Sequence, residues 1–155
     1  MGGQILREEG FEVQAAADGA QASAMLSSFD PLVILADVQL PVKSGYDLSK
    51  EAKAVVDGVA VVLTMAAMAG APDAERIRES GCDATISKPF EATALVEMVR
   101  RLAAGVEALR SNRQPKGAMD VDRERVEAAV TLALEASLPA LIQEITERVL
   151  IALRK

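Results

Sequence analysis

Two short runs of consecutive apolar residues constrain the fold of this chain more than any other feature of its sequence. Residues 32–36 read Leu-Val-Ile-Leu-Ala, and residues 59–63 read Val-Ala-Val-Val-Leu. Each run is too short for a helix of its own and does not alternate with polar residues, which is typical of a β-strand covered on both faces. Such strands occur in parallel sheets with helices on both sides, so the two runs predict an α/β domain.

The segments around these two runs alternate between strand and helix patterns. Two further short strands are predicted at residues 11–15 and 83–87. Apolar residues at helical spacing predict helices over residues 4–9, 20–29, 46–56, 72–80 and 91–109. This order predicts a doubly wound parallel sheet within residues 1–109, wrapped by helices and joined by right-handed crossovers.

Three polar residues stand where predicted strands end. Asp37 follows the first apolar run, Thr64 follows the second, and Lys88 follows the strand at 83–87. The carboxyl ends of parallel strands meet at one edge of the sheet, where such folds bind their ligands, so we expect these side chains to converge. A carboxylate there can attack phosphorus and form an acyl phosphate. The ammonium of Lys88 and the hydroxyl of Thr64 would contact the phosphoryl oxygens.

Three segments carry a resemblance to a known family. LVILADVQLPVKSG, VAVVLT and GCDATISKPF, followed by an amphipathic helix, resemble the receiver domain of bacterial two-component response regulators over residues 4–109. The resemblance implies a flavodoxin-like fold, with Asp37 as the phosphoacceptor, Lys88 as the family's invariant lysine and Mg²⁺ bound beside Asp37. It also implies a sensor histidine kinase or a phosphotransfer protein as the partner.

The start of the chain departs from the family's pattern. Family members begin with a central strand that ends in a pair of acidic residues, and those acids hold the magnesium. The first helix here, at residues 4–9, resembles the end of the family's first helix, so the predicted sheet lacks its first strand. We therefore expect Asp37 to be the one protein carboxylate at the metal and a poor phosphoacceptor. We also expect the strands near Val13 and Val33 to pair directly, or the chain to associate with a second copy.

Two other positions match the family's pattern ambiguously or differ from it. The hydroxyl that contacts the phosphoryl group is expected at Thr64, although the spacing also allows Met65, which cannot donate a hydrogen bond. Thr85 lies three residues before Lys88, where many family members carry an aromatic ring whose rotation reports phosphorylation. The resemblance thus implies that Thr85 occupies the switch position.

The remaining residues form a predicted linker and tail. Residues 110–120 are mostly polar and contain proline and glycine, which indicates a linker. Apolar residues at helical spacing over 121–136 and 139–154 predict that residues 121–155 form an amphipathic helical segment. A free helix with this much apolar surface would be a liability, so we expect oligomerisation or partner binding through the tail, or a dimer through residues 91–109.

Composition excludes several function classes. The net charge of −6 and pI of 4.8 leave no basic face for nucleic acid. One cysteine and no histidine exclude an intramolecular disulfide and imidazole chemistry. No apolar run approaches the ~18 residues of a membrane span, and the start lacks a signal pattern, so we expect a cytoplasmic protein without a membrane anchor.

These features predict a non-enzymatic, phosphorylation-responsive relay in a two-component phosphorelay, with output through protein contacts. The alternative is a phosphorylation-independent receiver that acts as an interaction or assembly adaptor. Labelling with acetyl phosphate and Mg²⁺, on this chain and on a chain with the first strand restored, would separate the two. An adduct only after restoration would indicate a truncated receiver, and no adduct in either form would favour the adaptor. A phosphatase-like hydrolase that uses Asp37 is disfavoured, because no second aspartate follows two residues later to act as general acid.

Overall fold

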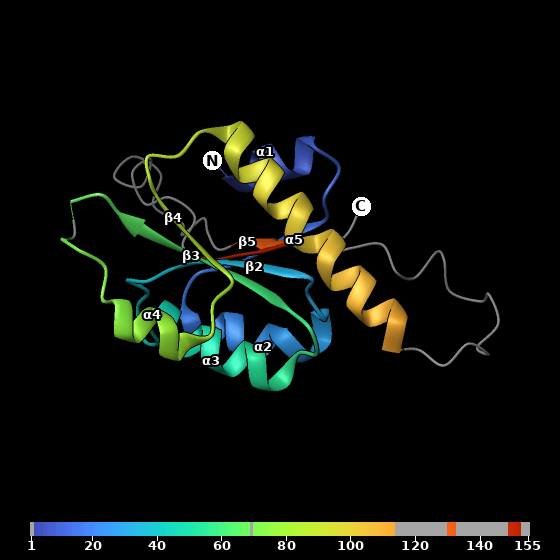
Figure 1. The fold of residues 1–155 in the computed structure, drawn as a ribbon, viewed down its shortest axis with the longest axis horizontal. Helices are drawn as coiled ribbons and strands as arrows, with labels where there is room; N and C mark the ends of the chain where they lie inside the picture. Colours follow the sequence, from blue (N-terminus) through green and yellow to red (C-terminus); the bar gives the residue numbers. More distant parts are fainter. Residues whose placement is uncertain (1, 69, 114–129, 133–148, 153–155) are drawn as a thin grey trace.

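A mixed β-sheet with helices on both faces forms the centre of the molecule (Figure 1). The computed structural model describes residues 2–68, 70–113, 130–132 and 149–152. Within them the sheet has six strands, in the spatial order β1 (Val13–Ala16), β5 (Val130–Leu132), β6 (Val149–Ala152), β2 (Val33–Asp37), β3 (Ala60–Ala66) and β4 (Ala84–Lys88). β2, β3 and β4 are mutually parallel, as predicted for the two apolar runs and the strand at 83–87.

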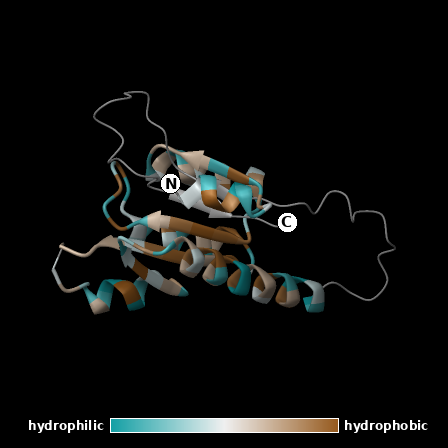
Figure 2. Cartoon of the chain, turned by 90° about the horizontal axis from the view of Figure 1, so that it is seen from above, coloured by the Kyte–Doolittle hydropathy of each residue, from teal (hydrophilic) through white to brown (hydrophobic). Residues whose placement is uncertain are grey.

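The helices form two layers that enclose the sheet. α2 (Gly19–Phe29), α3 (Gly45–Val55) and α4 (Ala74–Ser80) lie on one face, and α1 (Gly2–Glu8) and α5 (Ala92–Arg113) lie on the other (Figure 1). Figure 2 shows that the central strands are strongly hydrophobic, whereas the helices alternate between hydrophobic and hydrophilic residues. Side chains that alternate along the strands therefore pack into two separate apolar cores. One core lies under α1 and α5, and the other lies under α2 and α3.

Side-chain caps fix where the helices begin. The carboxylate of Asp18 accepts the backbone N–H of Gln21 at the start of α2, and Asp73 caps α4 in the same way. The hydroxyl of Ser44 accepts the N–H of Asp47 at the start of α3. Each cap of this kind is worth about 1 kcal/mol. The cap at Ser44 fixes the start of α3 close behind the end of β2.

α5 continues beyond its predicted end at residue 109, as far as Arg113. Two arginines hold this last turn against the domain. Arg110 donates to the carbonyl oxygens of Asp57 at 2.9 Å and Pro31 at 3.1 Å, and Arg113 pairs with the Asp57 carboxylate. The predicted linker at 110–120 therefore begins inside a helix that its own basic residues anchor.

A strand from the C-terminal part of the chain separates β1 from β2. β6 runs antiparallel to both neighbours, with Ala152 opposite Val13 and Val33. β5 pairs in parallel with β1 and in antiparallel with β6. The expectation that β1 and β2 would pair directly is therefore wrong. β6 supplies backbone donors and acceptors to the edges of β1 and β2 that would otherwise have paired with each other.

The same two strands correct the prediction for the tail. Residues 130–132 and 149–152 form β5 and β6, whereas the apolar spacing had predicted helix there. Both segments contain β-branched residues, which favour strands, and the gap between β1 and β2 provides partners that local periodicity does not reveal. The other residues of 121–155 lie outside the described residues. In the part of the chain that the structure describes, no helix has the length and hydropathy of a membrane span.

Candidate functional site

Three polar side chains meet at the carboxyl ends of β2, β3 and β4. Side chains of a strand alternate between the two faces, so residues two apart share a face. Asp37, Thr64 and Lys88 each stand at an even spacing from strand residues that pack into the core under α1 and α5, namely Val33, Leu35, Ala60, Val62, Ala84 and Ile86. The register places Asp37 opposite Thr64 and Lys88 opposite Ala66. The convergence predicted from the strand ends is therefore present.

Asp37 and Lys88 form an ion pair in this cluster. The Lys88 Nζ atom lies 2.8 Å from Asp37 Oδ2, and the side chains are 23% and 18% exposed. The other carboxylate oxygen, Oδ1, accepts the backbone N–H of Gln39 at 2.9 Å. Each oxygen of Asp37 thus has a donor that fixes the plane of the carboxylate, while the partial exposure leaves a path for a reactant.

Thr64 supplies a buried hydroxyl beside the ion pair. The residue is 2% exposed, and among the described residues its Oγ1 atom has no hydrogen-bond partner. A buried polar atom without a partner costs about 1–3 kcal/mol. Met65 stands one position further along β3, so its side chain points to the opposite face of the strand. Of the two residues that the spacing allowed, Thr64 is the one opposite Asp37.

The loop after Asp37 is held close to the strand end. The N–H of Val38 donates to the Thr64 carbonyl oxygen at 2.9 Å, and the N–H of Gly45 donates to the Val38 carbonyl oxygen at 3.3 Å. A Cβ atom on Gly45 would lie 2.3 Å from the carbonyl oxygen of Asp37. Only glycine fits this approach, which explains why the segment that opens α3 begins with it.

The same loop contains a strained residue. Val42 has φ +68°, and the N–H of Lys43 donates to the carbonyl oxygen of Pro41 at 2.7 Å, which closes a three-residue γ-turn. Positive φ is unfavourable for a β-branched residue, and such outliers cost about 1–3 kcal/mol. Sequence reasoning missed this feature, because valine gives no signal of positive φ.

Thr85 is the last of the positions singled out by the sequence. Thr85 lies exposed on β4 opposite Leu63, on the face of the sheet away from Lys88. The structure therefore does not bring it together with Asp37, Thr64 and Lys88. The peptide bond between Lys88 and Pro89 is cis.

Among the described residues, Asp37 is not part of a cluster of metal-binding side chains. The described residues contain no group of three or more histidine, cysteine, aspartate or glutamate residues that could hold a metal ion. Mg²⁺ needs near-octahedral oxygen coordination, commonly from one or two carboxylates with waters and phosphate oxygens. Asp37 is the carboxylate that the sequence placed at the magnesium ion, and its charge is already paired with Lys88. Asp18, which follows β1, is engaged as the cap of α2.

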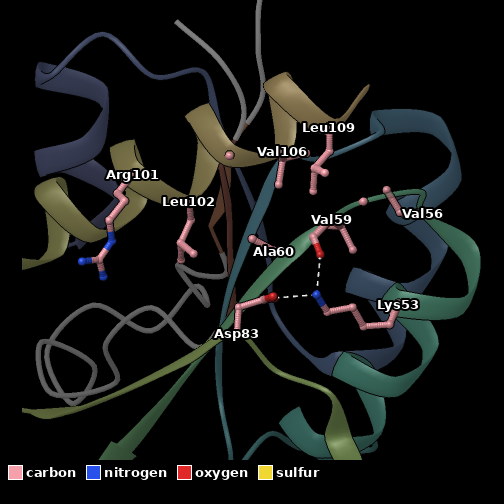
Figure 3. Close-up of a pocket in the computed structure, with 11 residues that line it drawn as sticks. Lys53, Val56, Val59, Ala60, Asp83, Arg101, Leu102, Val106 and Leu109 are labelled. Carbon is pink, nitrogen blue, oxygen red and sulfur yellow. Dashed lines mark hydrogen bonds and ion pairs between the residues drawn. The ribbon is translucent and has the colours of Figure 1, made fainter. Parts of the chain in front are cut away.

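A concave feature lies at the other end of the sheet, where β3 begins. A pocket of about 290 Å³ is lined by apolar residues of α5, by Lys53 and by Asp83 (Figure 3). Lys53 Nζ donates to the Val59 carbonyl oxygen at 2.7 Å and to Asp83 Oδ2 at 2.5 Å, and Asp83 also accepts the N–H of Val61. These contacts pair the charged groups of Lys53 and Asp83 and connect α3 to the sheet. The two residues therefore have a structural role at this pocket.

Comparisons with known proteins agree with this geometry. The family model described as the response regulator receiver domain matches residues 2–100. The polar-differentiation response regulator DivK of Brucella ovis is 32% identical over 97 residues, which cover 62% of this chain and 79% of that protein.

Solved structures share the fold. The CheY-like receiver domain protein of Methanospirillum hungatei superposes with a TM-score of 0.60 at 24% identity, over 72% of this chain and 86% of that one. NtrX of Brucella abortus in complex with ATP gives a TM-score of 0.61 at 24% identity over 72% of this chain. The matched region spans only 25% of the NtrX chain.

Proposed function

This chain belongs to the response regulator receiver domain family of two-component signalling, and from that premise we propose that it is a phosphorylation-responsive relay with Asp37 as its phosphoacceptor. One observation carries the proposal. The Asp37 carboxylate lies 2.8 Å from the Lys88 ammonium at the carboxyl edge of the sheet, and Thr64, whose buried hydroxyl has no partner among the described residues, stands opposite Asp37 in the register.

The proposed reaction is a phosphoryl transfer to a carboxylate. An oxygen of Asp37 attacks the phosphorus of a phosphohistidine on a sensor histidine kinase or a phosphotransfer protein. A P–O bond forms, the P–N bond breaks, and its electron pair remains on the departing imidazole. The product is an acyl phosphate on Asp37. Lys88 neutralises charge on the phosphoryl oxygens as they approach, which is the main task of the protein in such transfers.

Phosphorylation would change the local balance of charge. The phosphoryl group carries about −1.5 to −2 charges at neutral pH, and Asp37 gives up its own negative charge as the acyl phosphate forms, so the site beside Lys88 gains about −0.5 to −1 charge. The buried hydroxyl of Thr64 can then donate to a phosphoryl oxygen and gain the partner that it lacks among the described residues. A shift of Thr64 and β3 toward the new group would pass the signal to the surface, for partner binding or dimerisation through α5 or the tail.

A second candidate function is a receiver that acts as an adaptor without phosphorylation. The scarcity of metal ligands favours it, because the described residues contain no group of three or more histidine, cysteine, aspartate or glutamate residues that could hold a metal ion. Without a divalent cation, the approach of an anionic phosphoryl donor to a carboxylate is opposed by charge. In this case the scaffold would position α5 and the tail for protein contacts.

Intact-mass measurement after incubation with acetyl phosphate and Mg²⁺ tests the proposal. We expect one phosphoryl adduct on the full chain, absent in Asp37→Asn and retained in Asp57→Asn. Asp57 is a suitable control, because it is an aspartate in an ion pair at the opposite end of the domain, with Arg113. An adduct that persists in Asp37→Asn would reject Asp37 as the acceptor. The lack of any adduct in the unmodified chain would favour the adaptor.

A further inference from the structure

A half-buried charged cluster lies beside the loop that follows Asp37, and the proposed phosphoryl transfer does not use it. We propose that Lys43 is a positioning residue: its contacts with Ser23 and Glu51 hold the loop between β2 and α3, and through that loop they orient the carboxylate of Asp37. The inference deepens the proposed function and rests on it for the consequence at Asp37.

The cluster joins three parts of the fold. Lys43 comes from the loop, Ser23 from α2 and Glu51 from α3. Lys43 Nζ lies 2.8 Å from Ser23 Oγ and donates to Glu51 Oε2, while Ser23 Oγ lies 2.7 Å from the same Glu51 oxygen. The side chains of Lys43 and Glu51 are 31% and 35% exposed. A pair that is mostly shielded and shares a third polar partner is better fixed than an ordinary surface pair.

The charge state of Glu51 supports a persistent contact. The hydrogen bond from Lys43 lowers the pKa of Glu51 below its ordinary value, and a smaller contribution from Ser23 acts in the same direction. Burial opposes the shift and does not reverse it. Glu51 is therefore ionised at neutral pH, so the ion pair with Lys43 is present under the conditions in which phosphoryl transfer would occur.

The backbone of Lys43 is held as firmly as its side chain. A Cβ atom on Gly19 would lie 2.5 Å from the Lys43 carbonyl oxygen, so α2 begins in direct contact with the loop. On the other side, the N–H of Lys43 closes the γ-turn around Val42, which has φ +68°. A residue in a sparsely populated conformation stays there only when its surroundings impose it. The contacts of Lys43 lie immediately next to that residue and supply the constraint.

The loop passes this constraint to Asp37 over a short stretch of chain. Gln39 donates its N–H to Asp37 Oδ1, and only Leu40 and Pro41 separate Gln39 from the strained residue Val42. If Lys43 is released, Val42 can relax toward negative φ and the peptide of Gln39 can turn. Asp37 Oδ2 keeps its contact with Lys88, but Oδ1 loses its donor, so the carboxylate plane is no longer fixed.

Hydrogen exchange of the full chain tests this chain of contacts. In Lys43→Met, which keeps the length of the side chain and removes the charge, we expect the Gln39 amide to exchange about tenfold faster, while the amides of β3 are unchanged. Lys43→Arg should restore slow exchange. Lys50→Met is the matched control, because Lys50 pairs with Glu79 at 3.8 Å on the exposed outer surface of the helices. Lys50→Met should leave the exchange rate of the Gln39 amide unchanged.

A second variant and a second readout separate the possible failures. Glu51→Gln removes the other partner of the same ion pair. It should accelerate hydrogen exchange of the Gln39 amide in the same way, even if Lys43→Met does not fold. Unchanged exchange at Gln39 in a folded Lys43→Met or Glu51→Gln protein would overturn the inference. Faster exchange together with about tenfold slower labelling of Asp37 by acetyl phosphate supports it fully. Faster exchange in a chain that never labels, even unmodified, supports the positioning contact and rejects the phosphoacceptor role.

Discussion

Lys88 reaches across the end of β3 to place its ammonium 2.8 Å from the carboxylate of Asp37, although the two residues come from strands that are not neighbours in the sheet. The intervening strand presents Thr64 opposite Asp37. A carboxylate, an ammonium group and a hydroxyl are thus contributed by three adjacent parallel strands. Rigid strands hold such a constellation more accurately than loops do.

Removal of the cation should slow labelling of Asp37. In Lys88→Met, the phosphoryl oxygens lose their positive partner, so we expect labelling by acetyl phosphate to fall by about 10²-fold. Lys88→Arg keeps the charge and should retain more of the rate. The measurement is the initial rate of adduct formation by intact mass. Equal rates for Lys88→Met and the unmodified chain would show that Lys88 is not used in the transfer.

Replacement of Thr64 by valine should stabilise the domain. Valine has nearly the shape of threonine and lacks the buried Oγ1 atom that has no partner among the described residues. We expect the free energy of unfolding to rise by about 1 kcal/mol, measured by urea denaturation. Thr64→Ser retains the hydroxyl and should not show this gain. A loss of stability in Thr64→Val would indicate that the hydroxyl has a partner in solution.

Two glycine-to-alanine substitutions should have effects of opposite sign. In Gly45→Ala, the new methyl group meets the carbonyl oxygen of Asp37, so we expect a loss of about 1–3 kcal/mol. In Gly105→Ala, the methyl group enters open space in the middle of α5, so we expect a gain of about 0.5–1 kcal/mol from helix propensity. Urea denaturation measures both. A neutral Gly45→Ala would mean that the end of β2 is looser than its contacts indicate.

The strand ends were predictable because burial and chain direction are visible in the sequence. The apolar runs at residues 32–36 and 59–63 mark strands covered on both faces, and the parallel order then sends their last residues to one edge. Asp37, Thr64 and Lys88 follow from that rule with no knowledge of side-chain contacts. The same rule could not choose between Thr64 and Met65, because the choice depends on the pairing register with β2.

Two features could not be predicted, because they depend on tertiary partners. The role of β6 requires a vacant edge between β1 and β2, whereas the local spacing of residues 139–154 indicates a helix. The contact of Lys43 with Glu51 joins a loop to a helix face that the sequence shows only as a solvated surface. Local periodicity reports which face of an element is apolar, but it does not report what the polar face touches.

The stability supplied by Glu51 should disappear at acidic pH. Its pKa in the folded protein is below the ordinary value of 4.5, and the hydrogen bond from Lys43 is the largest cause. The folded state therefore holds this proton less tightly than the unfolded state, so the contribution is fully present above pH 4.5 and is lost as pH falls through the lowered pKa. The free energies of unfolding of the unmodified chain and of Glu51→Gln should differ at neutral pH and converge in acid. A difference that persists in acid would assign the effect to packing.

Disruption of β6 should expose the edges of β1 and β2. In Ile151→Pro, the substituted residue lies opposite Gln14 and Ile34, and proline cannot donate a hydrogen bond in the middle of a sheet. We expect a loss of about 3 kcal/mol or more in the free energy of unfolding, and faster exchange of the amides of β2. Ile151→Val, which suits a strand, is the control. Two strand edges without partners also favour pairing between molecules, so Ile151→Pro should form dimers or larger species in size-exclusion chromatography. A stable monomeric Ile151→Pro protein with protected β2 amides would show that β6 does not separate the two strands in solution.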